Sequence, residues 1–193
     1  TQGTLALSGN YDLAYAGADL TITRLAVTVT AAAQTKTYGA ADPELTYTVA
    51  PALIGGDAFA GALTREPGEN VGTYAITQGT LALSGNYTIA YVAGTLTITP
   101  MVLTVGGSFT VAEKVYDGTT VANVNAGALS GVVGGDTVNV GASGQYADKN
   151  AGLAKPVTIV LSLAGTDAGN YTLSQTGQSA TGDITPKTIT AGA

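Results

Sequence analysis

The sequence predicts an all-β protein made of small antiparallel β-sandwich modules in tandem. First, short stretches alternate apolar and polar side chains, as strands with one buried face do. Second, clusters rich in Gly, Asn, Asp and Pro separate these stretches, and no segment of helical periodicity lies between them. Third, the stretch GTLALSGNY occurs at residues 3–11 and again at residues 79–87. Together they favour immunoglobulin-like sandwiches, with a β-grasp-like sheet as the alternative.

The alternating stretches place the strands. In the first complete module we expect strands at residues 25–31, 44–50, 72–77, 80–84, 87–92 and 95–99, and in the second at residues 138–144 and 155–163. Period-2 alternation puts Tyr87, Ile89 and Tyr91 on one face. Residues 80–84 and 87–92 flank the turn sequence SGN, so they are predicted to form a hairpin. We expect the ring of Tyr87 to pack on the core and its hydroxyl to bond the backbone at the module end.

The internal repeat sets the domain organisation. Residues 1–29 align without gaps on residues 77–105, with 19 of the 29 positions identical, and a diverged third copy closes the chain. We therefore interpret residues 1–24 as the C-terminal part of a preceding repeat, 25–100 and 101–186 as complete modules, and 187–193 as the first strand of a following one. Single residues join the units, namely Arg24, Pro100 and Pro186. Proline fixes φ, so these junctions should be stiff.

Composition excludes several function classes. The chain has no Cys and no His, which removes disulfides, thiol catalysis and the commonest general base and metal ligand. The net charge is −6 and the seven basic residues are scattered, so no nucleic-acid partner is expected. No apolar run is long enough for a membrane-spanning helix. We expect no enzymatic activity and no cofactor.

The acidic residues are the remaining candidates for a site. Asp42 and Glu44 flank Pro43 in a turn, where a solvated pair is the simplest interpretation, and Asp57 and Asp136 stand in GGD turns that they should stabilise. Calcium is the one cation that the sequence suggests, because hard cations bind several oxygens at loop ends. Its candidate ligands are Asp117, Asp148 and Asp167, although no recognised calcium-loop spacing is present.

Long motifs carry a resemblance to two known domain families. KTYGAADPELTYTV (36–49), GENVGTYAITQGTL (68–81) and NYTIAYVAGTLTITP (86–100) resemble the YGX-type MBG domain of large bacterial surface adhesins. KVYDGTTVAN (114–123), GVVGGDTVNV (131–140), YADKNAGLAKPVTI (146–159) and GTDAGNYTLS (165–174) resemble the YDG domain of the same adhesins. The signature positions within these motifs are Tyr38, Gly39, Asp42, Pro43, Tyr87, Tyr116, Asp117, Gly118 and Tyr171. The resemblance implies repeat modules of secreted, filamentous-haemagglutinin-like exoproteins, without catalytic residues.

Three functions are compatible with such an array. The first is a stalk that projects or links adhesive regions at a bacterial cell surface, in cell adhesion or biofilm. The second is a multivalent module that binds a glycan, a mucin, a matrix polysaccharide or a protein, for which exposed Tyr rings would be needed. The third is self-association through unpaired strand edges into a filament or matrix. The partners common to all three are the neighbouring repeats.

Overall fold

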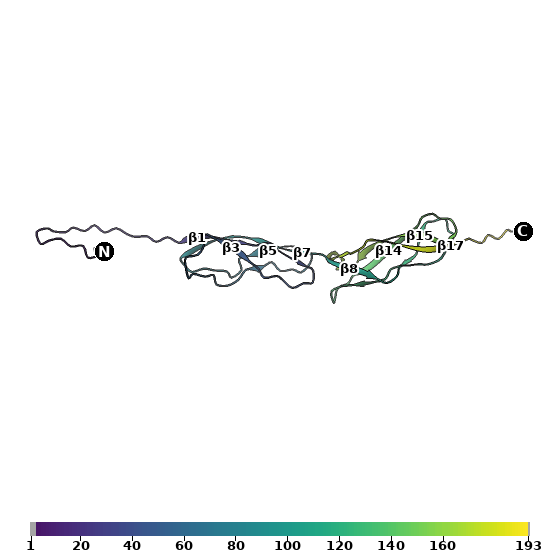
Figure 1. Ribbon diagram of the computed structural model, residues 1–193, viewed down its shortest axis with the longest axis horizontal. Coiled ribbons are helices and arrows are strands. Elements are labelled where there is room, and N and C mark those ends of the chain that lie inside the picture. The colour runs from purple at the N-terminus through teal and green to yellow at the C-terminus, as the bar shows by residue number, and fades with distance from the viewer. Residues whose placement is uncertain (1–2, 193) are drawn as a thin grey trace.

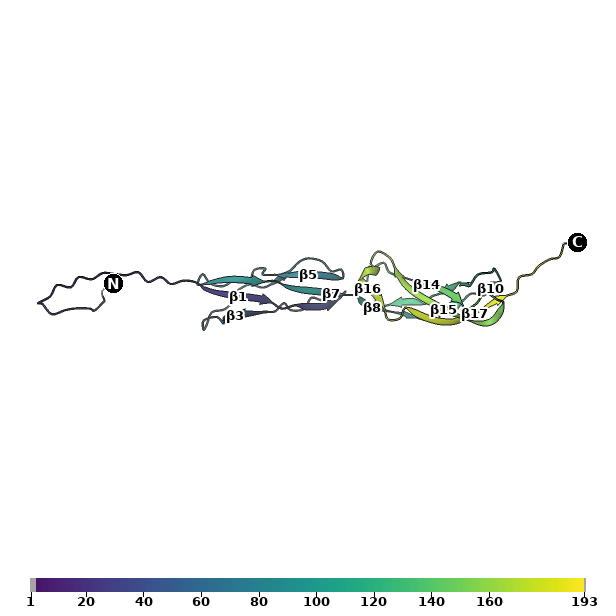
Figure 2. The same ribbon diagram turned by 90° about the horizontal axis from the view of Figure 1, so that it is seen from above.

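A computed structural model describes residues 3–192 of the chain, and it is all-β. Figures 1 and 2 show two separate bodies of strands that follow one another along a single long axis, with the N-terminal and C-terminal segments extending from opposite ends. We call them the first module (β1–β7) and the second module (β8–β17). Each has its own cluster of buried side chains, so each has its own core.

The first module consists of two small sheets. One has the strand order β3-β1-β6, with β1 at Leu25–Ala31, β3 at Tyr47–Ala50 and β6 at Tyr87–Val92. The other has the order β2-β7-β5-β4, with β2 at Gln34–Thr37, β4 at Thr64–Arg65, β5 at Gly72–Thr77 and β7 at Gly94–Thr99.

Alternation along the strands builds the core of the first module. In β1 the side chains of Val27, Val29 and Ala31 are buried while the residues between them are exposed. In β6 the expected face also forms, with Tyr87 buried and Ile89 and Tyr91 half-buried. Burial of such apolar side chains is the main favourable term in folding a module of this size.

The second module has the same plan, with longer strands in the centre of its larger sheet. One sheet has the order β13-β8-β16, with β8 at Met101–Gly106, β13 at Ala128–Ser130 and β16 at Tyr171–Leu173. The larger sheet has the order β10-β17-β15-β14-β11, with β10 at Lys114–Val115, β11 at Val121–Ala122, β14 at Asn139–Tyr146, β15 at Gly152–Ala164 and β17 at Gly177–Thr185. The short strands β9 (Thr110–Val111) and β12 (Val124–Asn125) pair with each other, and a 3₁₀ turn, η1 (Ala168–Asn170), precedes β16.

Strand registers show that the two modules are copies of one fold. Tyr87 lies opposite Leu25 in the first module, as Tyr171 lies opposite Met101 in the second. Lys36 lies opposite Ile98, as Lys114 lies opposite Ile184, and Gly72 and Gly152 lie opposite those same two isoleucines. Because the registers agree, a residue of one module can be assigned its counterpart in the other.

The sheets are antiparallel, as expected, except at two places in each module. β1 pairs with β6 and β2 pairs with β7 in parallel, and the corresponding pairs β8–β16 and β10–β17 are parallel as well. Parallel neighbours need a long crossover connection. Each of these pairs has one, since several other strands lie between its two members in the sequence.

The predicted hairpin of residues 80–84 and 87–92 does not form. β6 pairs instead with β1, and residues 80–84 contribute a single bridge, between Ala82 and Ala60, with Leu81 buried below it. Local alternation was correct about which side chains face the core. The strand partner depended on a segment some 60 residues earlier, which no local pattern encodes.

In the described parts of the two terminal segments, residues 3–24 and 187–192, no strand forms. Residues 3–24 are exposed throughout, and Leu20 and Ile22, which align with Leu96 and Ile98 of β7, are each 88% exposed. Residues 187–192 also lack strand structure, and Ala193 and residues 1–2 lie outside the described part. A strand needs a paired neighbour, and residues 1–24 contain no counterparts of β1, β2 or β5. Within residues 3–192, no helix is long and apolar enough to cross a membrane.

Candidate functional site at the junction of the two modules

One residue separates the last strand of the first module from the first strand of the second. β7 ends at Thr99, Pro100 follows, and β8 begins at Met101. The backbone N–H of Tyr38 donates to the carbonyl of Thr99 at 2.9 Å, and Tyr171 is the strand partner of Met101. The fold therefore holds Tyr38 and Tyr171 on the two sides of Pro100.

These two tyrosines share one carboxylate. The hydroxyl of Tyr38 donates to Oδ2 of Asp136 at 2.9 Å, and the hydroxyl of Tyr171 donates to the same oxygen at 2.5 Å. Their rings meet edge to face, with centroids 5.3 Å apart and an angle of 73° between the planes. This geometry is favourable for aromatic pairs. The hydrogen bond from Tyr38 to Asp136 joins the first module to the second.

The GGD turn of the second module orients that carboxylate. The backbone N–H of Asp136 donates to the carbonyl of Val133 at 3.1 Å, and the N–H of Val133 donates to the hydroxyl oxygen of Tyr171 at 3.0 Å. Gly39 of the first module packs on this turn, because a Cβ at Gly39 would lie 2.8 Å from Cγ2 of Val133. Gly39 also has φ of +77°, where a side chain is strained.

Asn170 makes the second set of contacts across the junction. Its Oδ1 accepts the backbone N–H of Val71 at 2.9 Å, and its Nδ2 donates to Oδ1 of Asn70 at 3.1 Å. The residue is only 7% exposed. A buried amide needs such partners, and here they come from the other module. η1 presents Asn170 immediately before β16.

An ion network supports the end of the first module that makes these contacts. Nζ of Lys36, which is buried, lies 2.6 Å from Asp42 and 2.5 Å from Glu69. Arg65 binds the same two carboxylates, with its Nε 2.7 Å from Asp42. Glu69 directly precedes Asn70, and Lys36 lies two residues before Tyr38. The network therefore ties together the two loops that reach the second module.

The charges of the junction shift several pKa values. The hydrogen bond to Asp136 raises the pKa of Tyr38 to about 12, because ionising Tyr38 would place two negative charges together. Burial, and then the same carboxylate, raises the pKa of Tyr171. Hydrogen bonds from Arg65 and Lys36 lower the pKa of Asp42 to about 2. Asp42 therefore stays ionised at neutral pH.

The opposite end of the first module carries the counterparts of the acceptor residues. The hydroxyl of Tyr87 accepts from the N–H of Ile54 at 3.1 Å and donates to Oδ2 of Asp57 at 2.5 Å. The expectation for Tyr87, a ring on the core and a hydroxyl bonded at the module end, is therefore confirmed. The far end of the second module likewise repeats the Tyr38 arrangement, since the N–H of Tyr116 donates to the carbonyl of Thr185 at 2.8 Å.

The carboxylates of the three calcium candidates all have hydrogen-bond or ion-pair partners within the second module. The carboxylate of Asp117 lies 2.8 Å from Nζ of Lys114 and accepts the backbone N–H of Thr119. Between Asp117 and Thr119, Gly118 has φ of +81°. The carboxylate of Asp148 binds Lys155 and the N–H of Asn150, and that of Asp167 accepts the N–H of Thr137. Within residues 3–192, no three acidic side chains group into a cluster that could hold a metal ion. Calcium binding stays a prediction.

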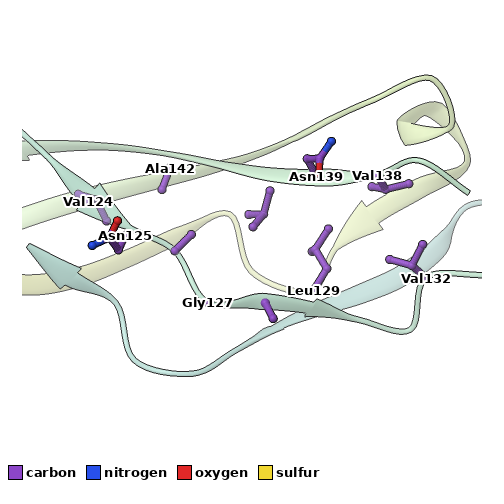
Figure 3. A pocket seen from close by; sticks show the side chains of 11 residues that line it. Val124, Asn125, Gly127, Leu129, Val132, Val138, Asn139 and Ala142 are labelled. Carbon is purple, nitrogen blue, oxygen red and sulfur yellow. The ribbon is translucent and has the colours of Figure 1, made fainter.

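The second module contains a hollow of about 580 Å³ between β12, β13 and β14. Figure 3 shows Asn125 and Asn139 on its wall among small and aliphatic side chains that include Val124, Leu129 and Val138. Its lining has no aromatic ring and no charged group. Sugar sites use aromatic faces together with converging polar groups. This hollow has two amide side chains from different strands but no aromatic face, so it lacks one of the two features of a sugar site.

Sequence reasoning missed two roles that the junction reveals. The sequence alone predicts only a turn-stabilising role for Asp136, and it assigns no role to Asn170. A signal was nonetheless present, because GGD and NY recur in both modules at Asp57, Asp136, Asn86 and Asn170. Likewise Asp42, expected as a solvated turn carboxylate next to Pro43, belongs to the Lys36 ion network.

The fold and the junction define a protein of tandem small all-β modules that dock end to end. Residues 27–97 match the MBG domain (YGX type), and residues 99–180 match the YDG domain. The chain therefore contains an MBG domain followed by a YDG domain, as the motifs predicted. Domains of these families are found in large surface adhesin-like proteins. Searches of the curated proteins and of the solved structures found no match to this chain.

Proposed function

We propose that this chain is a stalk segment of a bacterial surface adhesin, which holds adhesive regions away from the cell or links them to one another. The observation that carries the proposal is the junction at Pro100. A one-residue linker leaves little freedom between the modules, and Tyr38, Asp136 and Asn170 bind the two ends together. Repeat arrays gain stability from such contacts between neighbours.

The tyrosines support a spacer more than a sugar binder. Between residues 25 and 186 every tyrosine is buried or half-buried. At the junction the hydroxyl of Tyr38 makes a contact between the modules, and the hydroxyl of Tyr171 holds Asp136 in place for that contact. The exposed rings are Tyr11 and Tyr15, in the segment without strands. A groove lined by several exposed rings, which a multivalent glycan site would use, is not formed by the modules as described in residues 25–186.

The sheet edges also support a spacer more than a self-assembling filament. Most edge strands are very short, with two residues in β4, β10 and β11, and four in β2 and β3. Short edges are one way in which proteins avoid edge-to-edge pairing. β6 is the longer edge, with six residues. It is where association between chains would begin if the modules assembled.

The test combines binding and shape on the whole chain. The protein would be applied to a glycan and mucin array, with and without calcium, and its mass and dimensions measured in solution by light scattering and small-angle X-ray scattering. An elongated monomer that binds nothing on the array supports the stalk. A matched variant, Tyr11→Ala with Tyr15→Ala, removes the two exposed rings.

Two results would overturn the proposal. Reproducible binding that survives this double substitution would assign a ligand site to the modules themselves. Concentration-dependent growth into polymers would favour self-assembly. Binding abolished by the double substitution would place a ligand site on residues 3–24, and the modules would remain its support.

A further inference from the structure

The junction at Pro100 gives each module two different ends. The donor end of the first module supplies the Tyr38 hydroxyl, the backbone N–H of Val71 and the side chain of Asn70. The acceptor end of the second module supplies Asp136 and Asn170, with the hydroxyl of Tyr171 fixing Asp136 in place. The two ends have complementary chemistry, since the Tyr38 phenol and the Val71 N–H of the donor end meet a carboxylate and an amide oxygen of the acceptor end. The Asn170 amide donates in the opposite direction, to the side-chain oxygen of Asn70.

The first module has an acceptor end of its own, at the start of β1. By strand register Tyr87 is the counterpart of Tyr171, so Asn86 is the counterpart of Asn170. The hydrogen bonds of Asp57 and Ile54 to Tyr87 match those of Asp136 and Val133 to Tyr171. The whole acceptor set is therefore present and built with the same internal geometry.

Burial shows that this second acceptor set is uncovered. Asn170 is 7% exposed and Asp136 and Val133 are half-buried, whereas Asn86 and Asp57 are exposed and Ile54 is 66% exposed. The donor end of a neighbouring module would cover these exposed side chains, as the first module covers their counterparts in the second. A hollow of about 570 Å³ opens at this place, lined among others by Arg24, Leu25, Asp57 and Asn86.

We propose that the acceptor end formed by Ile54, Asp57, Asn86 and Tyr87 is a docking site for the donor end of an MBG-type module placed in series before it. The occupant is a second copy of residues 25–100, whose Tyr38 would donate to Asp57 and whose Val71 N–H would donate to Asn86. This donor end is the one that already docks on the second module. Val133 places its Cγ2 methyl group against Gly39. Its counterpart Ile54 has the same Cγ2 methyl group, so it could make this contact with Gly39 of the incoming copy.

The chain itself argues for that occupant. Residues 3–24 repeat the MBG sequence of residues 79–100 and contain the same LTIT sequence, which ends one residue before Leu25. The spacing thus matches that of Thr99, Pro100 and Met101. This proposal rests on the stalk function and deepens it, because one docking rule would then align every module of an array along a common axis.

The test uses a three-module chain, residues 1–100 followed directly by residues 25–193. Because the protein has no Cys, two single cysteines can carry spin labels for pulsed dipolar spectroscopy. Labels at Thr73→Cys of the first copy and Thr88→Cys of the second report the new junction. Labels at Thr73→Cys and Thr172→Cys of the natural chain report the Pro100 junction at equivalent exposed positions.

Docking predicts that both pairs give one narrow distance peak with the same mean. Asn86→Ala in the second copy should broaden the new peak, as Asn170→Ala should broaden the reference. The matched control, Asn123→Ala, changes an exposed asparagine outside both junctions. It should leave both distance peaks unchanged. If the three-module chain fails to give a cooperative melt, a second version keeps Arg24 as its linker residue and is labelled in the same way.

Three outcomes would overturn the docking. A broad distribution at the new junction beside a narrow one at Pro100 would do so while leaving the stalk function in place. Broad distributions at both junctions would count against the stalk as well. A narrow peak that Asn86→Ala leaves unchanged would show that the linker alone, and not the acceptor end, aligns the modules.

Discussion

The hydroxyl of Tyr38 in the MBG domain lies 2.9 Å from the carboxylate of Asp136 in the YDG domain, 98 residues later in the chain. Tyr38 reaches this position because its own N–H is bonded to Thr99, the last residue before the linker. The contact makes the orientation of the two modules a property of side-chain chemistry as well as of linker length. It also makes the junction open to direct tests.

Removing the Tyr38 hydroxyl should weaken the junction. Tyr38→Phe keeps the ring on Tyr171 but deletes a hydrogen bond to a charged group, which is worth about 1.5 kcal/mol. We expect a lower urea concentration at the midpoint of unfolding. We also expect small-angle X-ray scattering to show a wider range of orientations between the two modules. Tyr116→Phe removes the corresponding hydroxyl at the far end of the YDG domain and is the matched control. Equal effects of the two substitutions would contradict a role specific to the junction.

Asn170→Ala should expose the backbone N–H of Val71 to exchange. The substitution removes the Oδ1 atom that accepts this N–H and leaves a buried donor without its partner. Hydrogen exchange followed by NMR should show faster exchange at Val71, while amides in the core strand β15 keep their protection. Asn86→Ala, at the equivalent but exposed position of the MBG domain, should leave Val71 unchanged. Unaltered exchange in Asn170→Ala would mean that the contact does not persist in solution.

Gly39→Ala separates backbone strain from steric contact between the domains. Alanine at φ of +77° costs about 1 kcal/mol, and its methyl group would also press on Val133. Gly118→Ala meets a similar strain at φ of +81°, but no atom lies within 4 Å of its Cβ. We therefore expect the larger loss of thermal stability for Gly39→Ala. Matching losses in melting experiments would show that strain alone accounts for both.

The ion network of the donor end should lose its contribution in acid. The pKa of Asp42 is lowered to about 2 by Arg65 and Lys36, so the stabilisation is present above the ordinary Asp pKa near 4. It is lost as pH falls from about 4 towards 2, because the unfolded chain then binds the proton first. The melting temperature of the natural chain should drop across this window. Asp42→Asn should show a smaller drop, and parallel curves for the two proteins would argue against the network.

Alkaline titration should distinguish Tyr38 from the other tyrosines. The pKa of Tyr38 is raised to about 12, so its contribution is complete below the ordinary value near 10 and is lost as pH rises through about 12. Tyrosinate absorbance of the natural chain should include a late component in this range. In Tyr38→Phe that component should shrink, and in Asp136→Asn it should move to lower pH. A late component of undiminished size in Tyr38→Phe would assign it to another tyrosine.

Several features of this protein are determined by the sequence read locally. Alternation located β1, β5 and β6 with the bounds that the structure shows, and it identified Tyr87 as a core residue of the module end. The motifs around Tyr38 and Tyr116 indicated the two domain families. Strand positions and family motifs depend on short-range patterns, because alternation and turn chemistry act between residues that are close in the chain.

The tertiary structure alone decided which segments pair and which residues meet. It paired β6 with β1 in parallel instead of in the predicted hairpin, and it brought Glu69 to Lys36, Asp136 to Tyr38 and Asn170 to Val71. These contacts join residues that are separated by up to 99 positions or that lie in different domains. Local patterns say nothing about such partners, because they are selected by the packing of whole modules and by the single residue, Pro100, that sets one module on the next.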